Sequence, residues 1–421
     1  MKHAYQLASA TFAFSVGSGI VVVALPQTAL FYHMTSDQIG MLTAAQPFGY
    51  AVGCIGLGQL FHNVCGKRVM LGGTLVSVAA VLGIATFHTL WPLVLSQFVY
   101  GIALGAFWPF TAAWMLENDN IPRTRLLRVY NAGWTSGAAL GMYLAGVLCS
   151  EGFRAYTFFI SVAVTALSCI GPLLTPGPRS HLNISDDTPA AAPPRDPIGF
   201  PILLAGIIAN VTALGTRVMI SFNYPELNKA LNFDASRMGL FCAVALGGQL
   251  TAFLFGAVYE RFLGSRRMYA LMSGALIATS LAFGLTTNLA ILTAAMLVAG
   301  VVTATGFQSA ILAATEWFTS RRNATTIHEG FVGFAQVLPW FAGLAVQHAK
   351  DSGMETIAAL KMPFFVLPAI LAVTLCIQLA LVTFCKTRRL LLPRAEHGSV
   401  GATTTPTPKV RAPQILADGN S

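Results

Sequence analysis

Charged residues are scarce in this chain of 421 residues: Asp, Glu, Lys and Arg make up 10% of it, where soluble globular proteins have roughly 25%. Hydrophobic residues make up 55%. This combination excludes a disordered chain and a collagen-like fibre, and it argues against a single soluble core. Because the few charges gather in short strips between long apolar runs, the sequence is typical of a protein that spans a membrane.

The motifs of several kinds of site are also missing. The seven cysteines are scattered without C-x-x-C spacing, so we predict neither a disulfide framework nor a metal site. Gly66 and Lys67 are followed by arginine, not by the Ser or Thr of a phosphate-binding loop, which excludes ATP hydrolysis by this chain. No H-E-x-x-H or G-x-S-x-G pattern occurs, so we expect no enzyme activity and no cofactor. The net charge of +9 comes from dispersed clusters that suit membrane topology better than nucleic acid.

Twelve apolar runs are long enough to cross a bilayer, which takes about 20 helical residues. The sequence therefore predicts an all-α membrane protein. The expected spans are Leu7–Leu30, Gln38–Leu60, Val69–Phe87, Leu90–Leu116, Tyr130–Cys149, Tyr156–Leu174, Phe200–Tyr224, Arg237–Tyr259, Met268–Leu285, Leu289–Phe318, Glu329–His348 and Ala358–Phe384.

The loops divide these spans into two bundles of six. We expect an N-terminal bundle over 1–174, a Pro- and Asp-rich linker over 175–199, a C-terminal bundle over 200–385 and a disordered tail over 386–421. Most of the 25 Lys and Arg fall on one side if the amino terminus is cytoplasmic. The positive-inside rule then places both termini in the cytoplasm of a multi-pass inner or plasma membrane protein.

The two bundles carry an internal repeat. Pro26 matches Pro225 and Gly40 matches Gly239, each 199 residues apart. The loop G-Q-L-F-H-N-V-C-G-K-R-V-M from Gly58 is echoed by G-A-V-Y-E-R-F-L-G-S-R-R-M from Gly256. Paired repeats are typical of secondary transporters, in which two similar units rock about a site near the membrane midplane.

The repeated basic loop, the six-plus-six layout and the inside termini resemble the major facilitator superfamily. In that family the loop acts as a conformational latch, and the resemblance assigns this role to Gly58, Gly66, Lys67, Arg68, Gly256, Glu260, Arg261, Gly264 and Arg266. The first copy departs from the family pattern, because His62 stands where an acid belongs. Charges that only set topology are the alternative reading of Lys67 and Arg68.

Two further segments resemble the family in part. Leu95–Ala106 is similar to its R-x-x-x-G-x-x-x-G segment, with Gln97 in place of the arginine implicated in proton coupling. Met142 replaces the proline of the drug-antiporter signature, so that subgroup is not indicated. We interpret the glycines of the fifth span as sites of close helix packing. They are Gly133, Gly137, Gly141 and Gly146.

Polar side chains inside the spans point to a wet central passage. The resemblance makes spans 3, 6, 9 and 12 peripheral, and nearly all intramembrane amides avoid those four. On insertion scales a buried polar group costs a few kcal/mol, so amides face protein or water. Any one of them either lines the cavity or bridges helices. We assign to the substrate cavity Gln46, Asn131, Asn210, Gln249, Gln308 and Gln336, with Trp108, Trp134 and Trp340 as possible stacking or indole N–H partners.

Arg217 is the sharpest candidate for ligand binding, because it lies about 10 Å inside the seventh span. A buried cation needs a partner, which is an anionic ligand, Glu226 or helix carbonyls. No Asp or Glu is expected deep in the cavity spans. His328 and Glu329 are expected to open span 11, where an acid favours the helix dipole or forms a protonation switch.

We therefore predict a secondary active transporter for a small polar or anionic organic solute, working by alternating access as a monomer in the lipid bilayer. The solute moves alone or with a coupling ion. The alternatives are an exporter of amphipathic compounds, or a receptor or channel of the same fold.

Overall fold

The computed structural model describes residues 2–61, 65–116, 123–176, 199–256, 262–318 and 321–391. These ranges are helical and contain no β-strand. The helices of the first half are α1 (Lys2–Phe31), α2 (Ser36–Leu60), α3 (Gly66–Thr86), α4 (Leu90–Leu116), α5 (Arg123–Ser150), α6 (Arg154–Leu167) and α7 (Ile170–Leu174). Those of the second half are α8 (Gly199–Ala230), α9 (Ser236–Leu254), α11 (Arg266–Leu285), α12 (Leu289–Trp317), α13 (Arg321–Ala335), α14 (Leu338–Asp351) and α15 (Thr356–Leu391).

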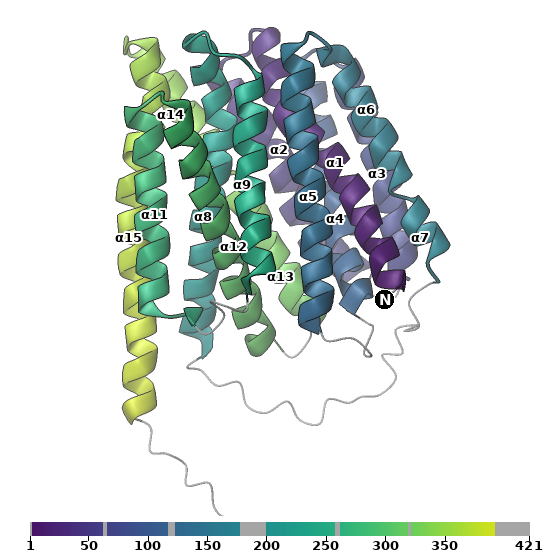
Figure 1. Cartoon of the computed structure of the whole chain (residues 1–421), viewed down its shortest axis with the longest axis vertical. Coiled ribbons are helices and arrows are strands. Elements are labelled where there is room, and N and C mark those ends of the chain that lie inside the picture. Colours follow the sequence, from purple (N-terminus) through teal and green to yellow (C-terminus); the bar gives the residue numbers. More distant parts are fainter. Residues whose placement is uncertain are drawn as a thin grey trace, which may run out of the picture.

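The long helices run roughly parallel to one axis (Figure 1). We call the end at which α1 begins the lower end and the end at which α1 finishes the upper end. The halves stand side by side, with α3, α6 and α7 at one edge and α11 and α15 at the other, as expected for peripheral helices (Figure 1). The expected all-α fold of two six-helix bundles is confirmed.

Eleven segments of the described chain are long and apolar enough to cross a membrane. The one expected span that is not among the eleven is the second, which forms α2, a helix of 25 residues. Its glycines and Gln46 lower its hydropathy, and it packs against α4 in its own half and against α13 and α14 in the other. A helix covered by protein on several sides needs fewer apolar side chains than one that faces lipid.

Two expected spans are interrupted. Span 6 is divided at Ser168 and Cys169 into α6 and α7, and span 11 is divided at Gln336 and Val337 into α13 and α14. The second break precedes Pro339, which starts the next helix because proline has no N–H for the preceding turn. Span 11 also begins at Arg321, two turns before its expected start, and α15 continues to Leu391, beyond the expected end at position 385.

Glycines bring the helices together as predicted. A Cβ on Gly133 would lie 2.8 Å from the Ala8 carbonyl oxygen, and Gly137 and Gly141 meet the next turns of α1 in the same way. Gly101 on α4 meets the backbone of Gln46 and Tyr50 on α2. Its repeat mate Gly300, 199 residues later, meets the equivalent backbone of α9, so the repeat seen in the sequence is a repeat of packing.

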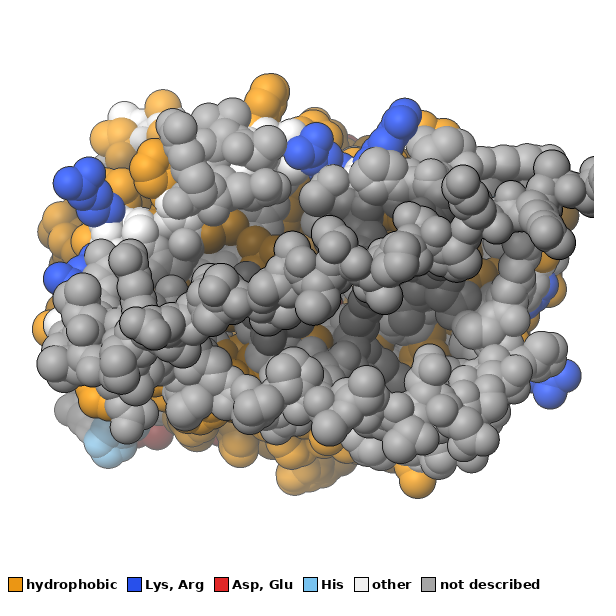
Figure 2. Space-filling view, turned by 90° about the horizontal axis from the view of Figure 1, so that it is seen from below, with side chains coloured by type: hydrophobic (Ala, Val, Ile, Leu, Met, Phe, Trp, Pro, Cys, Tyr) orange, Lys and Arg blue, Asp and Glu red, His pale blue; other side chains and the backbone are white. Residues whose placement is uncertain are grey.

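The halves meet through α1, α2 and α5 on one side and α8, α9, α13 and α14 on the other. At the upper end the contact is tight, because a Cβ on Gly239 of α9 would lie 2.8 Å from the Cα of Gly146 on α5. Viewed from the lower end, Lys and Arg side chains lie around the margin of the molecule, and hydrophobic side chains are visible at depth in its middle (Figure 2).

Candidate substrate cavity

Aromatic side chains from three helices of the first half meet in the bundle. The rings of Phe14 on α1 and Phe107 on α4 are stacked with centroids 3.8 Å apart, and Trp108 lies edge-on to Phe14 at 5.5 Å. Trp108 also contacts Tyr130 and Trp134 of α5, at 6.3 and 6.4 Å. Such edge-to-face pairs are favourable because the positive ring edge meets a negative ring face.

This aromatic cluster continues into the second half. Trp134 is 6.1 Å from Phe253 of α9, which is 5.9 Å from Phe307 of α12, which in turn is 4.5 Å from the ring of His328 on α13. Phe253 and His328 are buried, whereas Trp108, Trp134 and Phe307 are partly exposed although their partners come from both halves. Partly exposed rings between two bundles are the expected lining of a central passage. We call these five residues, together with Phe14, Phe107 and Tyr130, the aromatic belt.

Seven members of the belt lie about two to three turns from the lower ends of their helices, whereas Phe253 lies one residue before the end of α9. Trp134 is fixed locally by its indole N–H, which donates to the Asn131 side chain one turn earlier at 3.0 Å. Trp108 and Trp134 were predicted to line the cavity, and the structure brings them together. Trp340 does not join them: it is 38% exposed on α14 and packs beside Phe341.

Arg217 does not pair with Glu226, so that alternative is wrong. Its Nη1 donates to Oε1 of Gln249 on α9 at 3.1 Å, and its buried Nε has no partner. The two side chains meet because Arg217 and Gln249 lie at the same depth, each 13 residues from the upper end of its helix. A guanidinium that bonds one neutral amide keeps its charge and a free donor, which leaves it able to bind an anionic group.

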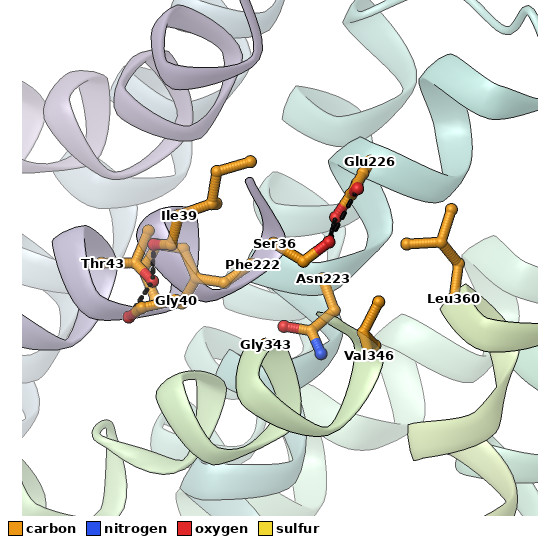
Figure 3. A pocket seen from close by; sticks show the side chains of 10 residues that line it. All are labelled: Ser36, Ile39, Gly40, Thr43, Phe222, Asn223, Glu226, Gly343, Val346 and Leu360. Carbon is orange, nitrogen blue, oxygen red and sulfur yellow. Dashed lines mark hydrogen bonds between the residues drawn. The ribbon is translucent and has the colours of Figure 1, made fainter. Parts of the chain in front are cut away.

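Glu226 instead belongs to a junction at the upper end. Its carboxylate forms an ion pair with Lys350 of α14, and it accepts a hydrogen bond from the Ser36 hydroxyl at 2.8 Å. Lys350 also donates to that hydroxyl, and the Ser36 amide donates to the Gln347 side chain at 3.3 Å. Ser36 and Glu226 border a small pocket, shown in Figure 3, with room for about one water molecule. The first residue of α2 is thus docked on an ion pair of the other half.

Glu329 lies two turns inside α13, which corrects the expectation that it sits at a helix start and that no acid is deep in the cavity spans. The Tyr50 hydroxyl of α2 donates to its Oε2 at 2.6 Å. His328 beside it is buried, and its Nε2 has no hydrogen-bond partner. Hydropathy missed this depth because the turns between Arg321 and Glu329 are polar although they are helical.

The predicted amides divide into two groups. Asn210 is buried without a partner for either amide atom, and Gln308 has a buried oxygen without one. Gln336, just after α13, donates to the Val332 carbonyl of that helix, and Gln249 and Asn131 bond Arg217 and Trp134 as given above. Gln46 is partly exposed.

Lys67, a predicted latch residue of the first loop, makes its described hydrogen bonds within its own half. Its ammonium donates to the carbonyl oxygen of Thr175 at 2.9 Å, beside the end of α7, where a cation is favourable for the helix dipole. Gly66 and Arg68 start α3, and Gly58 lies in α2. In the second copy Gly264 has a positive φ of 73° before α11, which begins at Arg266, Gly256 follows α9, and Glu260 and Arg261 lie outside the described residues.

Within the described residues, no group of three His, Cys, Asp or Glu side chains is arranged to hold a metal ion. The candidate cavity therefore consists of aromatic rings, amides, one guanidinium and one carboxyl, which suits reversible binding of an organic solute.

The described helices form the fold of a multi-pass membrane protein. The family model of the Major Facilitator Superfamily matches residues 7–210. Over that part of its length, the chain is similar to this family.

Among curated proteins, the chain is similar to the enterobactin exporter EntS of Citrobacter koseri, with 35% identity over 134 residues. It is also similar to EntS of Salmonella typhi, with 33% identity over 135 residues. Each match covers 30% of this chain and 31% of the relative, so it spans under a third of the relatives' length.

Two solved structures share the fold over nearly the whole chain. The nucleoside transporter NupG has a TM-score of 0.70 and 14% identity, covering 90% of this chain and 99% of NupG. A bacterial homologue of the human lysosomal transporter Spinster, in an inward-facing and unoccupied conformation, has a TM-score of 0.68 and 15% identity, covering 91% and 97%.

Proposed function

We propose that this protein is a secondary active transporter that exports a small aromatic solute bearing polar or acidic groups. The observation that carries the proposal is the aromatic belt, which crosses from the first half to the second with three of its rings partly exposed. A flat solute placed between Trp134 and Phe307 would replace water with ring contacts on both sides, and such contacts are worth about 0.5–1.5 kcal/mol each beyond area burial.

Polar groups around the belt match the polar part of such a solute. Arg217 offers a free donor to a carboxylate or phenolate, and Asn210 offers a donor and an acceptor that have no protein partner. A site whose buried polar groups are unpaired when empty favours ligands that satisfy them, because leaving them unpaired costs about 1–3 kcal/mol per group.

Alternating access follows from how the halves meet. In this structure the upper junction is closed by Ser36, Glu226 and Lys350 together with the packing of Gly146 on Gly239. Rocking the halves about the belt would open the upper end and close the lower one. We infer that Gly256, Gly264 and the basic loop residues hold the lower end closed in that second state.

The export direction is supported by the similarity to the EntS proteins, which are named as enterobactin exporters. The orientation is supported by charge. Lys67, Arg68, Arg125, Arg266 and Arg267 lie at the lower end, which the positive-inside rule assigns to the cytoplasm. We propose a monomer in a bacterial inner membrane or plasma membrane, with the two bundles at 1–174 and 200–385 as its units.

Flux in proteoliposomes tests the function. The purified chain is reconstituted, and uptake of enterobactin, benzoate and benzamide is measured with and without the same solute inside. A carrier shows saturable uptake that internal solute accelerates. Uptake that neither saturates nor shows this counterflow would support a channel, conversion of a solute without flux would support an enzyme, and the absence of any specific binding would support neither.

A pair of tryptophan variants locates the site. Trp134→Ala removes a ring from the belt and should weaken solute affinity by about tenfold. Trp91→Ala is the matched control, since Trp91 is 69% exposed near the upper start of α4 and should leave affinity unchanged. Equal effects of the two variants on solute affinity would show that the belt is not part of the binding site.

A further inference from the structure

Glu329 is a partly exposed acid inside the bundle, about two turns from the lower start of α13. The other acids whose side chains the structure describes lie near the upper ends of helices or in the upper loops: Asp37, Glu151, Glu226, Asp234, Asp351 and Glu355. The side chain of Glu329 lies between the two halves, because its hydrogen-bond partner Tyr50 belongs to α2. A solute between the halves can therefore reach this side chain without any prior movement of the helices.

Tyr50 favours the ionised form of the Glu329 carboxyl group, because a donor stabilises the negative charge. The Tyr50 hydroxyl donates to Oε2 at 2.6 Å, a length typical of an O–H donor on a carboxylate, about 2.5–2.7 Å. Within the described ranges the one ion pair joins Lys350 to Glu226. Glu329 is therefore a negative charge to which no described Lys or Arg is paired.

Aromatic rings of the belt lie beside Glu329. Tyr130 of α5 is near enough to interact with it electrostatically, and Trp108 lies edge-on to Tyr130 at 6.3 Å. In the second half, His328 precedes Glu329 in α13 and packs its ring on Phe307 at 4.5 Å. Trp108 and Phe307 are partly exposed. Ring faces attract cations through their quadrupole, so these rings and the carboxylate favour the same kind of ligand.

An organic ammonium group suits these neighbours better than a metal ion does. A bound Ca²⁺ or Mg²⁺ needs several oxygen ligands, and the described residues contain no group of three His, Cys, Asp or Glu side chains arranged to hold a metal. An alkylammonium instead pairs with a single carboxylate, while its methylene groups pack on the rings.

Arg217 is too far above Glu329 to pair with it. Tyr130, beside Glu329, lies one turn below Trp134 on α5. On α9, Gln249 lies one turn above the ring that Trp134 contacts, and Gln249 accepts the hydrogen bond from Arg217. The guanidinium is therefore about two turns, or roughly 11 Å, higher along the helix axes. The carboxylate and the guanidinium each need a counter-charge from elsewhere.

We propose that Glu329 and the rings beside it bind an organic ammonium group of the transported solute. A solute that displaces water from this carboxylate leaves it without hydration, and an ammonium group supplies the missing counter-charge. The inference deepens the proposed function, because it names a charged group of the same solute, and it rests on that function only for transport. Binding of an ammonium compound is measurable without flux.

Binding is tested by isothermal titration calorimetry on the full chain in detergent at neutral pH, where an alkylamine is protonated. The probes are phenethylamine and 2-phenylethanol, which share a ring and a two-carbon chain and differ in the ammonium group. The wild type should bind phenethylamine about tenfold more tightly, because a hydrogen bond to a charged group is the stronger one. Equal affinity for the two probes would overturn the proposal.

Variants locate the preference for phenethylamine. Glu329→Gln should abolish it and leave the affinity for 2-phenylethanol nearly unchanged, whereas Glu329→Asp keeps the charge and should keep most of the preference. Glu151→Gln makes the same substitution at an exposed acid after α5, and it should bind both probes as the wild type does. If the preference survives in Glu329→Gln, the ammonium group binds elsewhere and the proposal is wrong.

A measurement on the wild type locates the site even where Glu329→Gln fails to fold. Dicyclohexylcarbodiimide modifies carboxyl groups in apolar surroundings, and mass spectrometry identifies the modified residue. Phenethylamine should protect Glu329 from this reagent, and 2-phenylethanol at the same occupancy should protect it less. Equal modification with either probe would contradict the assignment of Glu329.

Flux separates this inference from the proposed function. If proteoliposomes carry benzoate or enterobactin but the chain does not prefer phenethylamine, the inference fails and the proposed function stands. If the preference is found at Glu329 and no solute is carried, the ammonium site stands and the proposed function fails.

Discussion

Gly146 on α5 and Gly239 on α9 touch backbone to backbone where the two halves meet at the upper end. A Cβ on Gly239 would lie 2.8 Å from the Gly146 Cα and equally close to the Met142 carbonyl oxygen. Neither neighbour is the end of a flexible side chain that could move aside. The close approach of the halves in this conformation therefore requires glycine at both positions.

Gly239→Ala should destabilise this closed junction by about 1–3 kcal/mol, because the added methyl group overpacks a rigid contact. A cysteine introduced at Asn223, which lines the pocket beside the junction, should then react faster with an impermeant maleimide added from the upper side. Gly247→Ala is the control on the same helix, since nothing lies within 4 Å of the Cβ it adds. Unchanged reactivity in Gly239→Ala would show that the junction adjusts to the methyl group.

The sequence was sufficient to predict the bundle but not its interior contacts. Apolar run length predicts the spans because the bilayer fixes the length of a helix, and the 199-residue offset predicts that Gly101 and Gly300 make the same contact. The break before Pro339 also has a local cause. In contrast, Glu226 lies nine residues after Arg217 in the chain, yet its partners come from α2 and α14. Which cation meets which acid depends on how the halves pack, and chain spacing does not contain that information.

The depth of Glu329 in the bundle was also predicted wrongly from the sequence. Hydropathy alone starts span 11 at Glu329, because the preceding turns contain Arg321, Arg322, Asn323 and Thr325. Those residues are nonetheless helical at the lower end, so Glu329 lies deeper than hydropathy suggests. Long polar side chains reach the interface from such positions, which allows a helix to begin before its apolar stretch.

Lys350→Met should weaken the upper junction by about 1 kcal/mol, since it leaves the Glu226 carboxylate with the Ser36 hydroxyl as a partner but without its cation. The pair is partly exposed, with 21% of each side chain accessible, so solvent screening keeps the effect small. Maleimide reaction of a cysteine at Asn223, which lines the pocket beside the junction, measures the opening.

The double variant Glu226→Gln with Lys350→Met provides the check for that experiment. Removing both charges should restore much of the closure lost in Lys350→Met, because no unpaired carboxylate remains. If the double variant opens as readily as the single one, the attraction between the two charges is not what holds the junction.

Arg217→Met should lower the affinity for benzoate about tenfold while leaving that for benzamide unchanged, because a charge-assisted hydrogen bond is worth about 1.5–3 kcal/mol and only the anion makes it. Isothermal binding measurements on the purified protein compare the two ligands. Gln249→Leu is the companion variant: it removes the amide that Arg217 bonds in the empty protein, so the guanidinium gains a further free donor. Equal loss of both ligands in Arg217→Met would indicate a structural role.

Asn210→Leu should raise the thermal stability of the empty protein and reduce its affinity for the solute. In this structure both amide atoms of Asn210 are buried without a partner, which costs about 1–3 kcal/mol that an apolar side chain of similar size avoids. Asn131→Leu is the matched comparison, because the Asn131 amide accepts the Trp134 indole N–H and its loss should lower stability. Thermal unfolding followed by tryptophan fluorescence, with and without enterobactin, measures both effects. An Asn210→Leu protein that is less stable when empty and binds normally would show that the amide supports the helices rather than the solute.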